Sequence, residues 1–64
     1  MGGNVKHYRE AKGLSQEQLA FEADLHHTYV SGVERGIRNP TVLIVAKLAT
    51  ALGVASSKLL EVKD

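Results

Sequence analysis

The sequence predicts an all-α protein: a compact bundle of about five short helices that forms one domain over residues 1–64. Glycine, aspartate and proline divide the chain into short segments, and apolar residues recur at helical spacing within each segment. No segment alternates apolar and polar residues as an amphipathic strand does. A chain of 64 residues fits one small domain, which buries only about 60% of its unfolded surface, so its apolar residues must be well placed.

The first predicted helix spans residues 4–12. Val5 and Tyr8 fall on one face with Ala11 beside them, while the charged residues point to water. Gly13 follows directly and is suited to end the helix, because many helix C-termini adopt the left-handed conformation that glycine allows.

The second predicted helix follows Ser15 and ends near Asp24. Ser15 and Gln18 have the spacing of a capping box, in which each side chain accepts a hydrogen bond from the other residue's backbone N–H. Leu19 and Ala20 then face inward. Asp24 is a reasonable end point, because aspartate tolerates the left-handed conformation of a turn better than most residues.

The third predicted helix covers about residues 27–35. Val30 and Val33 form its buried side. Gly32 is unexpected there, because a glycine within a helix costs about 1 kcal/mol relative to alanine, and that penalty requires a reason. The outward side collects Thr28, Ser31, Gly32 and Arg35, with His27 at its edge.

A fourth helix is predicted over residues 42–52 and a short fifth helix over about residues 56–61. Thr41 is placed to cap the fourth helix and Gly53 to end it. The inward side of the fourth helix consists of Val42, Val45, Leu48, Ala49 and Leu52, and that of the fifth of Leu59 with Leu60 beside it.

Composition excludes several classes of function. The formal charge is +1 and the pI about 8.1, so a basic surface must come from arrangement rather than from total charge. Without cysteine, neither a disulfide nor a thiolate metal site is available. No apolar run approaches the roughly 20 residues that span a bilayer, and the first residues lack the features of a signal peptide. We therefore expect a cytoplasmic protein without a membrane partner.

The sequence resembles a known family. The segments "REAKGLSQEQLA", "TYVSGVERG", "RNPT" and "LATALGV" occur in the order and at the spacing of the helix-turn-helix domain of phage-repressor-like regulators, the Cro/C1 or XRE type. The match covers residues 5–60, and "TYVSGVERG" also resembles the controller proteins of restriction–modification systems. The resemblance implies a lambda-repressor-like fold. It also implies a bacterial or phage transcriptional regulator that binds double-stranded DNA as a homodimer on a two-fold symmetric operator.

Two residues depart from the family pattern at the turn before the third helix. Asp24 stands where the family usually has glycine, and His26 where it usually has serine or threonine as the helix cap. An imidazole can accept a hydrogen bond from a backbone N–H, so His26 is expected to be a substitute cap, although histidine is not among the preferred ones.

The adjacent His26 and His27 do not indicate a metal or catalytic site. Neighbouring residues on a helix diverge by about 100°, and His7 is the only other histidine. No serine has the spacing of a nucleophile with its base. Because titratable groups do not converge, we expect no metal, no cofactor and no enzymatic activity.

The third helix is expected to read DNA bases. In a helix-turn-helix pair the second helix enters the major groove, with its N-terminal residues facing the base edges. Short or polar side chains suit this reading. Gly32 has no side chain to read with, but it lets the helix or a neighbouring side chain approach a base closely. The resemblance places the base contacts at His27, Thr28, Ser31 and Gly32.

Phosphate contacts are expected on either side of the reading helix. Gln16 lies in the first turn of the second helix, where free N–H groups favour an anion, and the resemblance puts a phosphate contact there. For Tyr29, packing of the ring and contact of its hydroxyl with a phosphate are equally expected. The expected phosphate-contacting residues are Gln16, Tyr29, Arg35, Arg38, Asn39 and Thr41.

Arg9 and Glu34 lie beside the apolar stripes of the first and third helices. The resemblance implies that they pair in a partly buried salt bridge. Such a pair fixes the orientation of two helices more reliably than it adds stability.

The dimer interface is expected at the start of the fourth helix. Leu43 and Ile44 are large and apolar where the family usually has polar residues, and they fall outside the core stripe. Two adjacent exposed apolar residues indicate a contact patch, which Leu60 or Val62 can extend. The alternative is that Leu43 and Ile44 pack on the domain's own N-terminal segment.

Several biological roles stay open at this point. Such a regulator represses by occupying a promoter or activates by contacting RNA polymerase. A restriction–modification controller, a phage-type repressor and an antitoxin are all compatible with the sequence. A protein-interaction module that binds a peptide or toxin through Leu43 and Ile44 is the alternative from another class.

Overall fold

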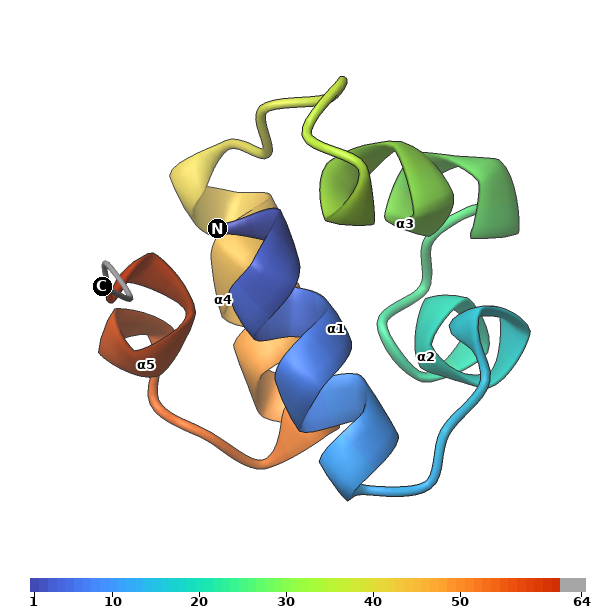
Figure 1. Ribbon diagram of the computed structural model, residues 1–64, viewed down its shortest axis with the longest axis horizontal. Coiled ribbons are helices and arrows are strands. Elements are labelled where there is room, and N and C mark those ends of the chain that lie inside the picture. The colour runs from blue at the N-terminus through green and yellow to red at the C-terminus, as the bar shows by residue number, and fades with distance from the viewer. Residues whose placement is uncertain (62–64) are drawn as a thin grey trace.

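The computed structural model describes residues 1–61, which form five α-helices and no strand (Figure 1). The predicted fold class is confirmed. Val62, one of the expected dimer residues, lies outside the described residues. The helices are α1 (Gly2–Ala11), α2 (Gln16–Glu22), α3 (His27–Glu34), α4 (Val42–Leu52) and α5 (Ser56–Leu60).

Hydrogen bonds between residues close in the sequence form the first turns of α1, α2 and α4. The Ser15 hydroxyl accepts a hydrogen bond from the Gln18 N–H (3.0 Å), and the Gln18 side-chain oxygen accepts one from the Ser15 N–H (2.8 Å), so the capping box is formed. The Thr41 hydroxyl likewise caps α4. α1 begins at Gly2, two residues earlier than predicted, because the Met1 carbonyl accepts two backbone N–H groups of the first turn.

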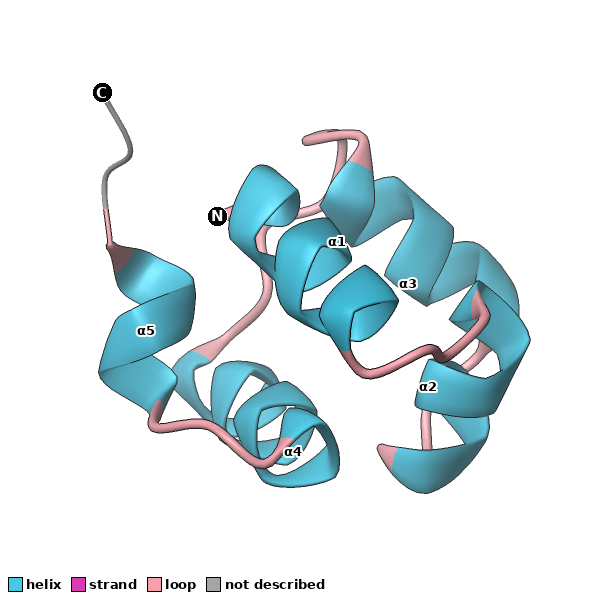
Figure 2. Cartoon of the chain, turned by 60° about the horizontal axis from the view of Figure 1, so that its bottom comes forward, coloured by secondary structure: helices cyan, strands magenta, loops and turns pink. Residues whose placement is uncertain are grey.

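α1 and α4 lie at the centre of the bundle, with the α2–α3 pair on one side and α5 on the other (Figure 1, Figure 2). Every other helix packs on at least one of these two. One hydrophobic core lies between the helices. Its largest fully buried side chains are Val5, Leu19, Val30, Val33, Leu48 and Leu59.

Four packing expectations are wrong. Leu60, expected beside Leu59 on the inward side of α5, is exposed. Val42, expected in the core stripe of α4, is 87% exposed, because it is the first residue of the helix and burial begins only at Val45. Ile44, expected outside the stripe, is half-buried against the core, because it shares a face with Leu48 one turn further on. Ala11 is exposed in the last turn of α1 rather than turned inward.

Polar side chains of α1 fasten it to the C-terminal part of the fold. Asn4 is buried, and its side-chain amide donates hydrogen bonds to the carbonyl oxygens of Leu59 (3.0 Å) and Glu61. Lys12, just beyond the end of α1, donates to the carbonyl oxygen of Ala51 (3.1 Å). These bonds hold α1 against α4 and α5, which leaves its other side free to carry α3.

Candidate nucleic-acid interface

The turn between α2 and α3 depends on the backbone of Asp24. Its φ is 57°, and it is the only residue other than glycine with a positive φ in residues 1–61. The Leu25 N–H then donates to the Ala20 carbonyl (2.8 Å), which closes the end of α2. Aspartate is among the few residues that visit this conformation. The turn is therefore formed without the glycine that the family usually has there.

His26 occupies the N-cap position of α3 with an extended backbone. Its side chain makes no capping hydrogen bond, so the expectation of a substitute cap is wrong. The physical reason is that capping suits a short side chain with an oxygen close to the backbone, whereas the imidazole nitrogens stand further from it. Only the His26 carbonyl takes part in starting the helix, by accepting from the N–H groups of Tyr29 and Val30.

α3 turns its apolar residues inward and leaves a polar strip on the outside. Val30 and Val33 are buried in the core, and Tyr29 is half-buried against it. Ser31 is half-buried as well. The exposed residues of α3 and its C-cap are His27, Thr28 and Arg35.

Gly32 does not lie on the open surface, contrary to the sequence-based expectation. It is buried, because the side chain of Arg38 from the following loop crosses α3 at this position. A Cβ atom added to Gly32 would lie 2.6 Å from the Arg38 Cγ. The structure therefore brings Arg38, expected beyond the end of the reading helix, onto the helix itself. The unexplained glycine within α3 was the sequence signal for this arrangement.

The salt bridge implied by the family resemblance is formed. The Arg9 Nε donates to Glu34 Oε2 (2.7 Å) and its Nη2 to Oε1 (3.1 Å), with side chains that are 11% and 3% exposed. Arg9 also donates to the Leu14 carbonyl (2.8 Å). The hydrogen bond with Glu34 is the main cause that raises the pKa of the Arg9 guanidinium above its ordinary value.

The expected phosphate-contacting residues lie on α3 or on the segments before and after it in the chain, and they differ in exposure and in hydrogen bonding. Gln16, the first residue of α2, is half-buried and donates from Nε2 to Glu34 Oε1 (3.0 Å). α1, α2 and α3 therefore meet at Glu34, which fixes how α3 is presented. Asn39 and Thr41 are exposed on the way from α3 to α4.

Of the three expected dimer residues that lie within residues 1–61, two are available for contact. Leu43 is 67% exposed and Leu60 is 59% exposed, on the neighbouring helices α4 and α5. The alternative that Leu43 and Ile44 both pack on the N-terminal segment is therefore wrong for Leu43. Ile44 contributes to the protein's own core. The exposed apolar side chains are thus Leu43 on α4, which lines the hollow beside the α2–α3 turn, and Leu60 on α5.

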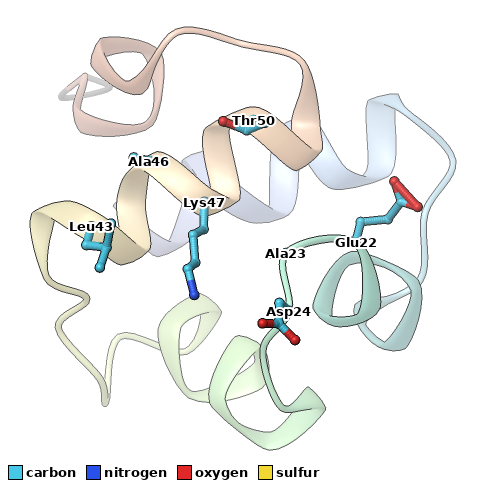
Figure 3. Close-up of a pocket in the computed structure, with 7 residues that line it drawn as sticks. All are labelled: Glu22, Ala23, Asp24, Leu43, Ala46, Lys47 and Thr50. Carbon is cyan, nitrogen blue, oxygen red and sulfur yellow. The ribbon is translucent and has the colours of Figure 1, made fainter.

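A hollow of about 360 Å³ lies between the α2–α3 turn and α4 (Figure 3). Lys47 extends from α4 toward Asp24 in the turn, while Glu22 points away from the hollow.

Within residues 1–61, no group of three histidine, cysteine or acidic residues is placed to hold a metal ion. None of the helices described above is long and apolar enough to span a bilayer.

Comparison with known proteins identifies the family. The helix-turn-helix family profile matches residues 5–59. Control protein C.BamHI of Bacillus amyloliquefaciens is 48% identical over 61 residues, which cover 94% of this chain and 75% of that protein. The crystal structure of the restriction–modification controller protein C.AhdI from Aeromonas hydrophila is 50% identical, with a TM-score of 0.89 and coverage of 91% and 88%.

A third similar protein was solved together with DNA. It is SinR, described as the master regulator for biofilm formation, and it is 34% identical with a TM-score of 0.89. The alignment covers 94% of this chain and 97% of that one. Both the sequence matches and the structural matches extend over α1 to α5 rather than over the α2–α3 pair alone. The chain therefore belongs to the helix-turn-helix family of DNA-binding transcriptional regulators.

Proposed function

We propose that this protein is a cytoplasmic regulator that binds a two-fold symmetric operator as a homodimer and reads the major groove with α3. The observation that carries the proposal is the exposed polar strip of α3 at His27 and Thr28, presented on a helix fixed by the Arg9–Glu34 pair. The similarity to SinR, which was solved in complex with DNA, supports the same use of this fold.

The base-reading side chains in this proposal are His27, Thr28 and Ser31, the first two at the N-terminal end of α3 that enters the groove. Phosphates are contacted around them by the side chains of Gln16, Tyr29, Arg35, Asn39 and Thr41. The Tyr29 ring packs on the core, so its hydroxyl is the part that reaches the DNA. When Gln16 binds a phosphate, its side-chain amide either leaves Glu34 or donates to both groups.

The proposed role is control of the genes of a restriction–modification system. Its support is the similarity to the control protein C.BamHI and to the controller protein C.AhdI over nearly the whole chain. Repression by promoter occupation and activation through RNA polymerase are both compatible with this role. Transcription in vitro from the gene's own promoter, with and without the protein, distinguishes them by the sign of the change.

Selection of duplexes from a random DNA library tests the proposal directly. We expect the selected DNA to contain an inverted repeat whose halves are about one helical turn, roughly 34 Å, apart. We also expect weaker, strongly salt-dependent binding to random duplex DNA. A protein-interaction module built on the same scaffold would bind neither, and that result would contradict the proposal.

Thr28→Ala is expected to relax base preference at one position in each operator half. Thr28 is exposed near the N-terminal end of α3, so its hydroxyl and methyl group can meet a base edge. The cost for operator binding should be roughly 1–3 kcal/mol, with little change for random DNA. Titration of single-base operator variants measures this. An equal loss on operator and random DNA would argue against base reading.

Gln16→Ala is expected to weaken binding to all DNA sequences. Gln16 begins α2, outside the reading strip, so it contributes a phosphate contact rather than a base contact. The slope of log affinity against log salt concentration reflects charge neutralisation, and a neutral amide should leave it nearly unchanged. Arg35→Ala, which removes a charge, is the matched variant and should reduce that slope by about 1. Selective loss on the operator alone would overturn the assignment of Gln16.

A further inference from the structure

We infer that Gly2 is a positioning residue for DNA binding. Because Gly2 has no side chain, the first turn of α1 packs directly on the backbone at the end of α3 and sets where that end lies. The inference rests on the proposed DNA-binding function and goes beyond it, since Gly2 lies in α1, outside the α2–α3 pair. Without a polar or basic side chain, Gly2 acts on DNA binding only through α3.

The start of α1 meets the end of α3 backbone to backbone. A Cβ atom added to Gly2 would collide with the carbonyl oxygen of Val33 and would lie 2.7 Å from the carbonyl oxygen of Glu34. Real Cβ atoms essentially never come within 3.0 Å of another heavy atom. Both obstacles are main-chain atoms, which cannot rotate away as the end of a side chain can. Only glycine therefore lets the two backbones approach this closely.

The first turn of α1 is held in place from its other side. The carbonyl oxygen of Met1 accepts hydrogen bonds from the N–H groups of Asn4 (3.0 Å) and Val5 (3.1 Å). The Asn4 side chain donates to the carbonyl oxygen of Leu59 (3.0 Å), and Val5 is fully buried in the core. The start of α1 is thus fixed to α5 and to the core. With a larger residue at position 2, the displacement falls on the end of α3.

The atoms that Gly2 contacts also hold the loop after α3. The carbonyl oxygen of Val33 accepts a hydrogen bond from the Gly36 N–H (3.1 Å), and that of Gly32 accepts one from the Arg38 N–H (3.2 Å). Arg38, one of the expected phosphate-contacting residues, lies against α3 through this loop. A shift of the Val33 carbonyl therefore moves the loop and Arg38 relative to the exposed residues of α3.

Gly2 and Arg9 support α3 at two points of α1. Arg9, two turns further along α1, binds the side chain of Glu34 (2.7 Å). Rotation of the two side chains can adjust that contact, whereas the backbone contact at Gly2 has no such freedom. Two points of support fix the direction of α3 as well as its distance from α1. Since binding groups must be held within about 0.5 Å of their productive geometry, this direction affects how well α3 fits the operator.

Gly2→Ala is the test, and Gly3→Ala is its matched control. Both changes add one methyl group in the first turn of α1 and favour the helix, but an added Cβ on Gly3 meets nothing within 4 Å. We expect Gly2→Ala to lower operator affinity roughly 5- to 150-fold, the effect of one mismatched base pair. Affinity for random duplex DNA and its salt dependence should stay unchanged, because they depend on phosphate charge. Gly3→Ala should bind the operator as wild type does.

Nuclear magnetic resonance of the free proteins measures the cause of this loss. The backbone amide resonances of Gly36 and Arg38 should shift in Gly2→Ala and stay in place in Gly3→Ala. In the wild-type protein, nuclear Overhauser effects should connect the α-protons of Gly2 with protons of Glu34. Unshifted loop amides in Gly2→Ala, or the absence of these effects in the wild type, would show that α3 does not depend on this contact and would overturn the inference.

A purely structural role of Gly2 gives a different result. If Gly2 contributed only to stability, affinities for operator and random DNA would fall together, and equal losses would overturn the positioning role. If Gly2→Ala unfolds at the assay temperature, the double variant with Gly3→Ala, compared with Gly3→Ala alone, repeats the measurement in a background that favours the helix. If the wild type binds no duplex DNA at low salt, the proposed function itself is wrong. Normal operator selection by Gly2→Ala contradicts only the role of Gly2.

Discussion

Replacing Glu34 with alanine is expected to lower the free energy of unfolding by about 3–5 kcal/mol, the usual cost of removing one partner from a buried ion pair. The Glu34 side chain is 3% exposed and accepts hydrogen bonds from Arg9 and Gln16. Without it, the largely buried Arg9 guanidinium keeps only the Leu14 carbonyl. A domain of 64 residues has a total stability of roughly 3–10 kcal/mol, so most of it would be lost.

Thermal unfolding followed by circular dichroism measures this effect, and a decrease in Tm of roughly 10–40 °C is expected. The matched control is Glu61→Ala, which breaks the exposed pair with Lys58 (3.4 Å) and should cost less than about 1 kcal/mol. Replacing both partners, with Arg9→Met and Glu34→Leu, should recover much of the stability, because no buried charge remains. Equal Tm values for Glu34→Ala and Glu61→Ala would show that α3 is not held by this pair.

The double change Leu43→Ser and Leu60→Ser is expected to convert the proposed dimer into monomers. Both side chains are exposed, so the fold itself should keep its stability. The two side chains lie on neighbouring helices, α4 and α5, and the proposed dimer would bury them. A monomer binds one half-site at a time, so operator affinity should fall roughly 10²- to 10⁴-fold as the linkage between half-sites is lost.

Sedimentation velocity at several protein concentrations, together with operator titration, measures both parts of this prediction. Val42→Ser is the matched control, since Val42 is even more exposed than Leu43 and lies next to it on a different side of α4. It should leave both the dimer and operator affinity unchanged. A double variant that sediments as wild type would exclude Leu43 and Leu60 from the interface, and dissociation by Val42→Ser would move the interface to another face of α4.

The helices could be predicted from the sequence because their boundaries depend on short-range chemistry. Ser15 with Gln18 forms a capping box, and Thr41 caps α4, through atoms only three residues apart. Asp24 adopts the left-handed conformation that its side chain tolerates. The pairing of Arg9 with Glu34 was different, because it joins residues 25 apart and was implied by family resemblance rather than by local pattern.

The remaining features depend on contacts between elements, which periodicity does not encode. Helical spacing assigned Val42 to the core, but the start of α4 is not covered by other helices. Gly32 faces outward on an isolated helix, but in the folded protein the loop after α3 returns and the side chain of Arg38 covers it. The position of His26 predicts a helix cap, but its imidazole makes no capping hydrogen bond, because the ring nitrogens stand too far from the backbone.

The Asn4 side chain has a consequence for the order in which the structure opens. It joins α1 to the last carbonyls of α5 across a sequence separation of 55 residues, in a helical domain where most contacts are local. Chain ends normally fray independently and exchange their amide hydrogens fastest. If α5 unwinds, the buried Asn4 side-chain amide loses its acceptors, and if the start of α1 unwinds, the carbonyl oxygens of Leu59 and Glu61 lose their donor. We therefore expect the first and last helices to open in one cooperative event, with protection against hydrogen exchange that approaches that of global unfolding.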